Sequence, residues 1–143
     1  MQPVFKDHNF HGANHRPLLD KSISIERTFK NKKATFIIQS KNVGHNFPSG
    51  DILRRITLQI KEKDQWKTKH TMGKNFIIQM ENGKPHKRLQ HNTSLQPGVP
   101  QTVTFSSKVN TPWRLVYHYA SVEDEQRAMI PYDQLIYVMN EGP

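Results

Sequence analysis

The sequence predicts an all-β protein, an antiparallel β-sandwich of seven to eight short strands. Apolar residues alternate with polar ones along most segments of the chain, as they do in strands with one buried face. Nine Pro and seven Gly supply the turns that short strands need. Only 34% of the residues are apolar, which suits the thin core between two sheets, and 143 residues are enough for one domain.

The first two strands are expected on either side of a basic turn at residues 30–33. Two isoleucines alternate with polar residues before the turn, and three apolar residues do so after it. These five are Ile23, Ile25, Ala34, Phe36 and Ile38. The pattern is typical of an antiparallel pair with one face toward the core.

The next strand, 52–60, should have two different faces. One face would carry Ile52, Arg54, Ile56, Leu58 and Ile60, and the other Leu53, Arg55, Thr57 and Gln59. Arg54 is therefore expected on the apolar side, where it would hold a carboxylate such as Asp51 or a backbone carbonyl.

The remaining strands follow a series of turn signals. Trp66 begins the return strand, and the Asn82-Gly83 pair predicts a type I′ hairpin between residues 76–80 and the segment around His86. A turn at 95–100 precedes alternating residues at 102–106.

Farther along, residues 113–119 predict a strand with Trp113, Leu115, Tyr117 and Tyr119 on one face. Residues 121–129 fit either a helical turn or a long loop, and 135–139 form a last apolar strand. Seven to eight strands at such spacing, without helical crossovers, favour an immunoglobulin-like sandwich.

Residues 1–20 have no clean period of 2 or 3.6, and they include three histidines. We interpret 1–20 as an extended, histidine-rich N-terminal arm and 21–143 as the β-sandwich domain. A helix through His8, His11 and His15 is disfavoured by Asn9, Gly12 and Asn14, and Pro17 limits its continuation.

The composition excludes several kinds of binding site and favours one class of partner. With no cysteine, the chain cannot form a disulfide, a thiolate metal site or a covalent haem attachment. No apolar run is long enough for a membrane span, and the N-terminus lacks the apolar core of a signal peptide. The formal charge of +9 favours anionic partners such as phosphates, acidic protein surfaces or haem propionates.

A corner motif carries the clearest family resemblance. Residues 42–51, NVGHNFPSGD, lead into Arg54-Arg55 and resemble the N-x-G-H-x-[FL]-P-T-G corner of a β-sandwich module. That module stands at the C-terminal end of periplasmic multihaem c-type cytochromes. Residues 8–14, HNFHGAN, with Leu18-Leu19 resemble the H-x-F-x-G-x-h…L-L segment just before it, and the 95–98 turn fits the same layout. The resemblance covers nearly the whole chain.

Two features depart from that family. Its members carry C-x-x-C-H haem sites ahead of the module and this chain has none, while Ser49 replaces the usual Thr but keeps the hydroxyl. The resemblance implies a haem-free, non-enzymatic accessory module of a periplasmic or otherwise extracytoplasmic electron-transfer system. Its partner would be a multihaem c-type cytochrome, as a separate subunit or as an upstream part of the same protein. The structural hallmark of the module would be the corner residues Gly44, Phe47, Pro48, Gly50, Asp51 and Arg54.

The histidines have competing interpretations. In the resembled proteins a histidine of the 8–15 segment serves as distal ligand to a nearby haem, which makes His8, His11 and His15 candidate axial ligands to haem c of a partner chain. His45 either joins them or only bonds the amides of its corner. The same four histidines could instead converge on zinc or copper. His70, His86, His91 and His118 lack a companion motif and are interpreted as surface residues.

Another class of function remains open. The charge, with Trp66, Trp113 and tyrosines on strands, suits a nucleic-acid or polyanion-binding β domain, although the aromatic residues alternate inward as core residues do. Catalytic patterns are missing: the sequence has no G-x-S-x-G, no H-E-x-x-H and no phosphate-binding Gly loop. We therefore expect no catalytic residues and no enzyme activity.

Overall fold

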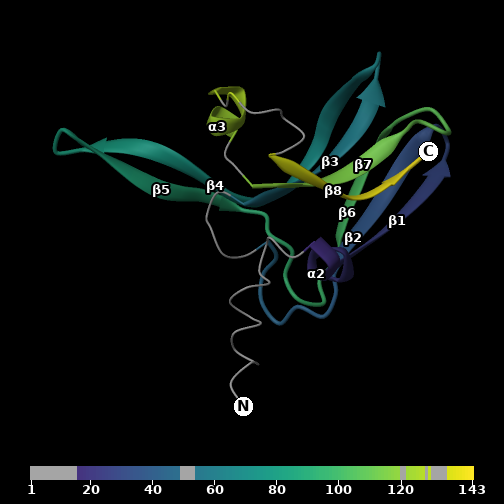
Figure 1. Ribbon diagram of the computed structural model, residues 1–143, viewed down its shortest axis with the longest axis horizontal. Coiled ribbons are helices and arrows are strands. Elements are labelled where there is room, and N and C mark those ends of the chain that lie inside the picture. Colours follow the sequence, from purple (N-terminus) through teal and green to yellow (C-terminus); the bar gives the residue numbers. More distant parts are fainter. Residues whose placement is uncertain (1–15, 49–53, 120–121, 128, 130–134) are drawn as a thin grey trace.

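Two antiparallel sheets make up the protein in a computed structural model that describes residues 16–48, 54–119, 122–127, 129 and 135–143 (Figure 1). The first sheet has the order β1-β2-β6 and the second the order β5-β4-β3-β7-β8. The strands are β1 (Ile23–Lys30), β2 (Lys33–Ser40), β3 (Arg55–Glu62), β4 (Gln65–Glu81), β5 (Lys84–Asn92), β6 (Gln101–Ser106), β7 (Trp113–His118) and β8 (Ile136–Gly142). Two short helices are α2 (Arg16–Lys21) and α3 (Val122–Arg127).

The predicted all-β sandwich is confirmed. In the immunoglobulin variable-type arrangement, the second sheet is extended beyond strands C, F and G by C′ and C″, and here β4 and β5 occupy those places. Strands β1, β2 and β6 correspond in order to A, B and E. The segment that would hold strand D, 93–100, contributes only an isolated bridge through Leu95.

Three hairpins turn in the same way. The central pairs Asn31/Lys32, Lys63/Asp64 and Asn82/Gly83 all have positive φ, between 51° and 75°. This is the backbone of the type I′ turn, whose twist matches that of the flanking strands. The Asn-Gly turn is the one that the sequence predicted. At the other two, Asn31 and Asp64 are residue types that favour the left-handed conformation, whereas Lys32 and Lys63 adopt it although lysine does so uncommonly.

The core lies between the two sheets and follows the predicted alternation. Phe36 and Ile38 of β2 face Ile56, Leu58 and Ile60 of β3, and all five are at most 2% exposed. Phe36 stacks on Phe105 with ring centroids 5.7 Å apart and meets Trp113 edge-on at 5.3 Å. Because β2, β6 and β7 each supply one of these rings, the aromatic cluster joins the two sheets.

The extended conformation expected for residues 1–20 is wrong for its last five residues, since Arg16–Lys21 is the helix α2. Pro17 lies in the first turn of this helix, where the missing N–H costs nothing. Leu19 is 3% exposed and belongs to the core, and the Tyr137 hydroxyl of β8 donates to the Asp20 carboxylate at 2.7 Å. Residues 1–15 lie outside the described part of the chain.

Strand β4 is longer than the sequence suggested. It runs for 17 residues and joins the return strand at Trp66 and the segment 76–80 into one strand. Of the two interpretations of residues 121–129, the helical turn is confirmed for Val122–Arg127, which form α3. Both helices that the structure describes are six residues long, and neither has the length and apolar composition needed to cross a membrane.

Replacing Phe36 by Ala is expected to lower the free energy of unfolding by about 3–5 kcal/mol, because the cavity would open at the centre of the aromatic cluster. Ile37→Ala, on the opposite face of the same strand, is the matched control and should cost about 1 kcal/mol or less. Urea unfolding followed by tryptophan fluorescence measures both. Equal losses would contradict the placement of Phe36 at the centre of the core.

Candidate functional site

At the predicted corner, two backbone hydrogen bonds join Phe47 to Leu95. Phe47 and Leu95 form an isolated antiparallel bridge, with N···O distances of 2.8 Å and 2.7 Å in the two directions. The Phe47 ring is buried and lies 6.4 Å from the Tyr117 ring, and a cis peptide bond joins Phe47 to Pro48. This part of the corner therefore fastens the loop after β2 to the turn before β6. Gly50 and Asp51 lie outside the described residues.

His45 is exposed on the same corner. Its Nδ1 lies 3.0 Å from the backbone oxygen of Asn46, to which the protonated nitrogen can donate. Its Nε2 has no hydrogen-bond partner among the described residues. The neighbouring Gly44 is exposed, and a Cβ there would meet no atom within 4 Å. Nδ1 of His45 thus makes a hydrogen bond within the corner, as a structural role would require, and Nε2 remains accessible to a ligand.

Arg54 is half-buried just before β3. Its guanidinium carbon lies 5.1 Å from the centre of the Tyr119 ring, a cation–π contact. Tyr119 in turn packs on Tyr117, with ring centroids 5.2 Å apart. Arg54 therefore closes the end of the core with its side chain on an aromatic face, while its expected partner Asp51 is outside the described residues.

The other predicted ligands, His8, His11 and His15, also lie outside the described part of the chain. Within that part, no group of three or more His, Cys, Asp and Glu residues could hold a metal ion. Haem ligation and metal binding by His8, His11, His15 and His45 therefore stay predictions.

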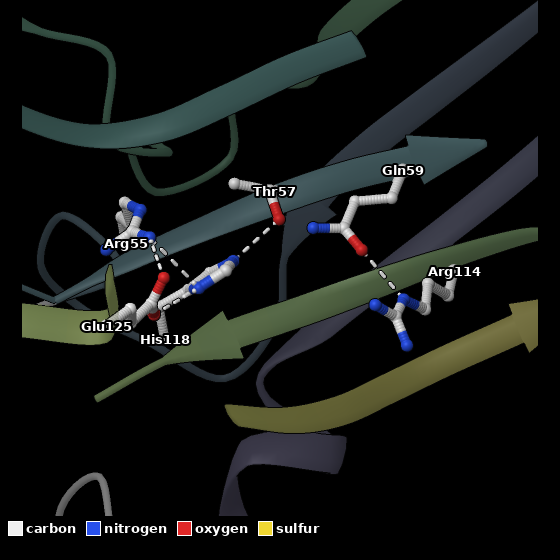
Figure 2. Close-up of polar contacts among 6 residues, drawn as sticks. All are labelled: Arg55, Thr57, Gln59, Arg114, His118 and Glu125. Carbon is white, nitrogen blue, oxygen red and sulfur yellow. Dashed lines mark hydrogen bonds and ion pairs between the residues drawn. The ribbon is translucent and has the colours of Figure 1, made fainter. Parts of the chain in front are cut away.

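A buried polar network is the feature that sequence reasoning missed (Figure 2). It joins Arg55 and Thr57 of β3, His118 of β7 and Glu125 of α3. The Thr57 Oγ1 lies 2.7 Å from His118 Nε2, and His118 Nδ1 lies 2.8 Å from Glu125 Oε2. Arg55 donates to Glu125 Oε1 at 2.7 Å. The structure thus brings together three elements through one histidine.

Strand alternation places these side chains on the face of the second sheet that points away from the core. Arg55 and His118 are direct partners in the β3–β7 register, and Thr57 follows two residues after Arg55. Glu125 comes from α3, between β7 and β8. The assignment of His118 to the surface was wrong, since its exposure is 2%. His70, which was also interpreted as a surface residue, is half-buried, and its Nε2 lies 2.7 Å from Gln101 Oε1.

The protonation state of His118 follows from its surroundings. Burial lowers the pKa of its imidazole, and the Arg55 guanidinium lowers it further, while the Glu125 carboxylate opposes both. A neutral imidazole has one proton to place, and only Glu125 requires a donor. We therefore assign the proton to Nδ1, so that Nδ1–H donates to Glu125 and the Thr57 hydroxyl donates to Nε2. Arg55, 3.1 Å from Nδ1, then bonds Glu125 rather than the ring.

Hydroxyl, imidazole and carboxylate occur here in the order found in hydrolase triads. Thr57 is only 3% exposed, however, and His118 only 2%. A substrate cannot reach a hydroxyl buried in this way, so the geometry provides no accessible nucleophile. What the arrangement does is bind α3 to the sheet with charge-assisted hydrogen bonds.

A second polar contact lies on the same face (Figure 2). Arg114 donates from Nε to Gln59 Oε1 at 2.7 Å, and its guanidinium carbon lies 4.3 Å from the centre of the Trp66 ring. Trp113 is 8% exposed and part of the core. One tryptophan is thus buried and the other has a face covered by arginine, so neither offers the open stacking platform that single-strand binding uses.

Comparisons with known proteins support the fold. No known protein family matches the sequence, and no curated protein does. Among solved structures, the chain is similar to a penta-haem cytochrome c552 from Thermochromatium tepidum, with a TM-score of 0.63 and 15% sequence identity. The match covers 94% of this chain but only 42% of the cytochrome. At this identity the likeness shows a shared fold, and the chain spans less than half of that cytochrome's length.

The network makes stability depend on pH. Because the folded state holds the pKa of His118 below its ordinary value, the unfolded state binds the proton first as pH falls. The free energy of unfolding should therefore decrease from pH 7 to pH 5, with a slope of at most about 1.4 kcal/mol per pH unit.

Urea titrations at several pH values check this, with His118→Gln expected to flatten the curve. His86→Gln removes an exposed histidine of β5 and serves as the control. If His118→Gln kept the same pH dependence as the wild type, the assignment of a neutral buried imidazole would be wrong.

Proposed function

We propose that this chain is a non-enzymatic β-sandwich module that works with a multihaem c-type cytochrome outside the cytoplasm. The observation that carries the proposal is the fold match, since nearly the whole chain superimposes on part of a penta-haem cytochrome. The partner is either a separate subunit or another part of the same protein.

The sequence adds support of a different kind. The segments 8–14 and 42–51 resemble, in order and spacing, two motifs of multihaem cytochromes, one just before their C-terminal β-sandwich module and one within it. The chain has no cysteine, so it cannot carry haem c by thioether bonds, and any covalently bound haem c in the system belongs to the partner. A formal charge of +9 suits docking near haem propionates or an acidic protein surface.

Within this function, one of His8, His11, His15 and His45 supplies an axial ligand to a partner haem. His45 is the candidate with a described geometry. Its exposed ring has one nitrogen on the Asn46 carbonyl, which sets the tautomer and leaves Nε2 as the unprotonated, ligating nitrogen. The iron itself would supply the redox chemistry, while the chain would position the imidazole.

The test uses multihaem c-type cytochromes purified from the periplasm of the source organism. The wild-type chain should bind one of them, measured by biolayer interferometry, with an affinity that falls as salt rises. Addition of the chain should also shift the Soret band of the ferric cytochrome toward the low-spin, bis-histidine form.

Single alanine variants of His8, His11, His15 and His45 identify the ligand, because one of them should abolish the spectral shift while retaining binding. His86→Ala is the control. Binding with no spectral change in the wild type would remove the ligand role alone. Failure to bind any of the purified cytochromes, together with a natural full-length protein that carries no haem, would overturn the proposed function.

A further inference from the structure

The hairpin of β4 and β5 extends beyond the sandwich as a two-stranded ribbon (Figure 1). The first half of β4 pairs with β3 as far as Gly73, and from Lys74 onward its described partner is β5 alone. All nine residues of β5 are exposed. We call residues 74–92 the ribbon arm. The eight β4 residues of this arm extend over about 26 Å at the usual rise of a strand.

The base of the ribbon arm is held firmly. The Thr93 backbone N–H donates to the Gly73 carbonyl at 2.8 Å, and the Gly73 N–H donates to the Thr93 hydroxyl at 3.2 Å. The Thr93 hydroxyl also lies 2.9 Å from the Thr71 carbonyl. These contacts fix the position at which the arm leaves the sandwich and therefore the direction in which it starts.

One face of the ribbon arm is mostly apolar. The cross-strand pairs that share this face are Phe76 with Leu89, Ile78 with Lys87, and Met80 with Pro85. Ile78, Met80 and Leu89 are 69%, 67% and 53% exposed. The Lys87 ammonium lies 5.8 Å from the centre of the Phe76 ring at the edge of this face.

This face continues the core side of the second sheet. Met72, two residues before Lys74 on the same side of β4, is fully buried and pairs with Ile56. The three-stranded sheet covers the strand up to that point, and the same alternation then carries the apolar side chains out into solvent. The ribbon arm therefore presents half of a sandwich without the layer that would cover it among the described residues.

An arm of this kind is expected to have another protein surface packed against its apolar face. An isolated two-stranded hairpin is marginally stable in water, and contiguous exposed apolar side chains indicate an interaction surface. The edge strand β5 carries Pro85 together with Lys84, Lys87 and Arg88, and proline and lysine on an edge discourage the addition of another strand. The apolar face, rather than the edge, is thus suited to docking.

The net charge of the ribbon arm indicates which kind of protein can pack on its apolar face. The ribbon arm has four basic residues, Lys74, Lys84, Lys87 and Arg88, against the single acidic Glu81, which leaves a net charge of +3. Arg88 is already paired with Glu81 at 2.7 Å. Two arms packed face to face would bring two such charges together, whereas an acidic surface would neutralise them. A different, acidic protein fits the face better than a second copy of this chain.

We propose that the ribbon arm is the element by which this chain docks onto its partner protein, on a partner surface with an apolar centre and a rim of carboxylates. The proposal rests on the proposed function for the identity of that partner, the multihaem cytochrome.

The experiment uses the cytochrome that binds the wild-type chain. Ile78→Asp and Met80→Asp should each weaken binding at least tenfold, since they place a charge on the apolar face. Lys87→Glu should slow association and reduce the salt dependence of the affinity. Val109→Asp changes an exposed apolar residue in the loop between β6 and β7 and is the matched control, expected to bind as the wild type does.

Hydrogen exchange measured by mass spectrometry adds a map that does not depend on substitution. Residues 74–92 should exchange more slowly in the complex than in the free chain, and circular dichroism should show that each variant keeps the wild-type strand signal. Sedimentation of the free wild-type chain should give a monomer.

Each other outcome is decisive. A complex whose affinity is unchanged in the Ile78 and Met80 variants, with protection elsewhere, would overturn the docking role of the ribbon arm and leave the proposed function intact. A dimer of the free chain that Ile78→Asp disperses would show that the occupant is a second copy. Failure of every purified cytochrome to bind, together with a natural full-length protein that carries no haem, would overturn both proposals.

Discussion

Strand β3 is buried on both of its faces, and much of the structure follows from this. Its even-numbered residues Ile56, Leu58 and Ile60 form the centre of the sandwich core. Its odd-numbered residues Thr57 and Gln59 are only 3% and 5% exposed, although they face away from that core. A buried hydroxyl or amide without a partner would cost about 1–3 kcal/mol, so this second face must supply hydrogen bonds of its own.

The neighbouring strand β7 and the helix α3 meet that requirement. His118 partners Thr57, Arg114 partners Gln59, and Glu125 balances the charge of Arg55. The middle of the five-stranded sheet, at β3 and β7, is therefore covered by apolar packing on one side and by a polar layer on the other. This explains how a chain with so few apolar residues can bury residues 56–60 of its central strand on both faces.

Much of the fold could be predicted because it depends on local alternation. The faces of β3 and β7 and the Asn82-Gly83 hairpin follow from side chains one or two positions apart. The site could not be predicted in the same way. Glu125 reaches His118 only because α3 folds back onto the sheet, and a histidine behind an apolar face has the same pattern whether water or a helix covers it.

Other differences have similar causes. The sequence did not predict helix α2, because six residues have too little helix propensity of their own and this helix depends on the burial of Leu19. The continuation of β4 past the end of β3 depends on its pairing with β5, so the uncovered face of the ribbon arm becomes evident only when both registers are known. The alternation at 76–80 alone would suggest an ordinary core strand.

The anchoring of α2 would limit where a partner haem could lie if, as proposed, one of His8, His11 and His15 bound its iron. Leu19 in the core and Asp20 on the Tyr137 hydroxyl hold the helix against β8. A chain extends at most about 3.5 Å per residue, so the five residues from Arg16 back to His11 can span no more than about 18 Å, and the eight back to His8 no more than about 28 Å. Whatever conformation residues 1–15 take, an iron bound by one of these imidazoles is confined to a sphere around the start of α2. The distance from the start of α2 to the haem iron of a docked partner would therefore show whether such ligation is possible.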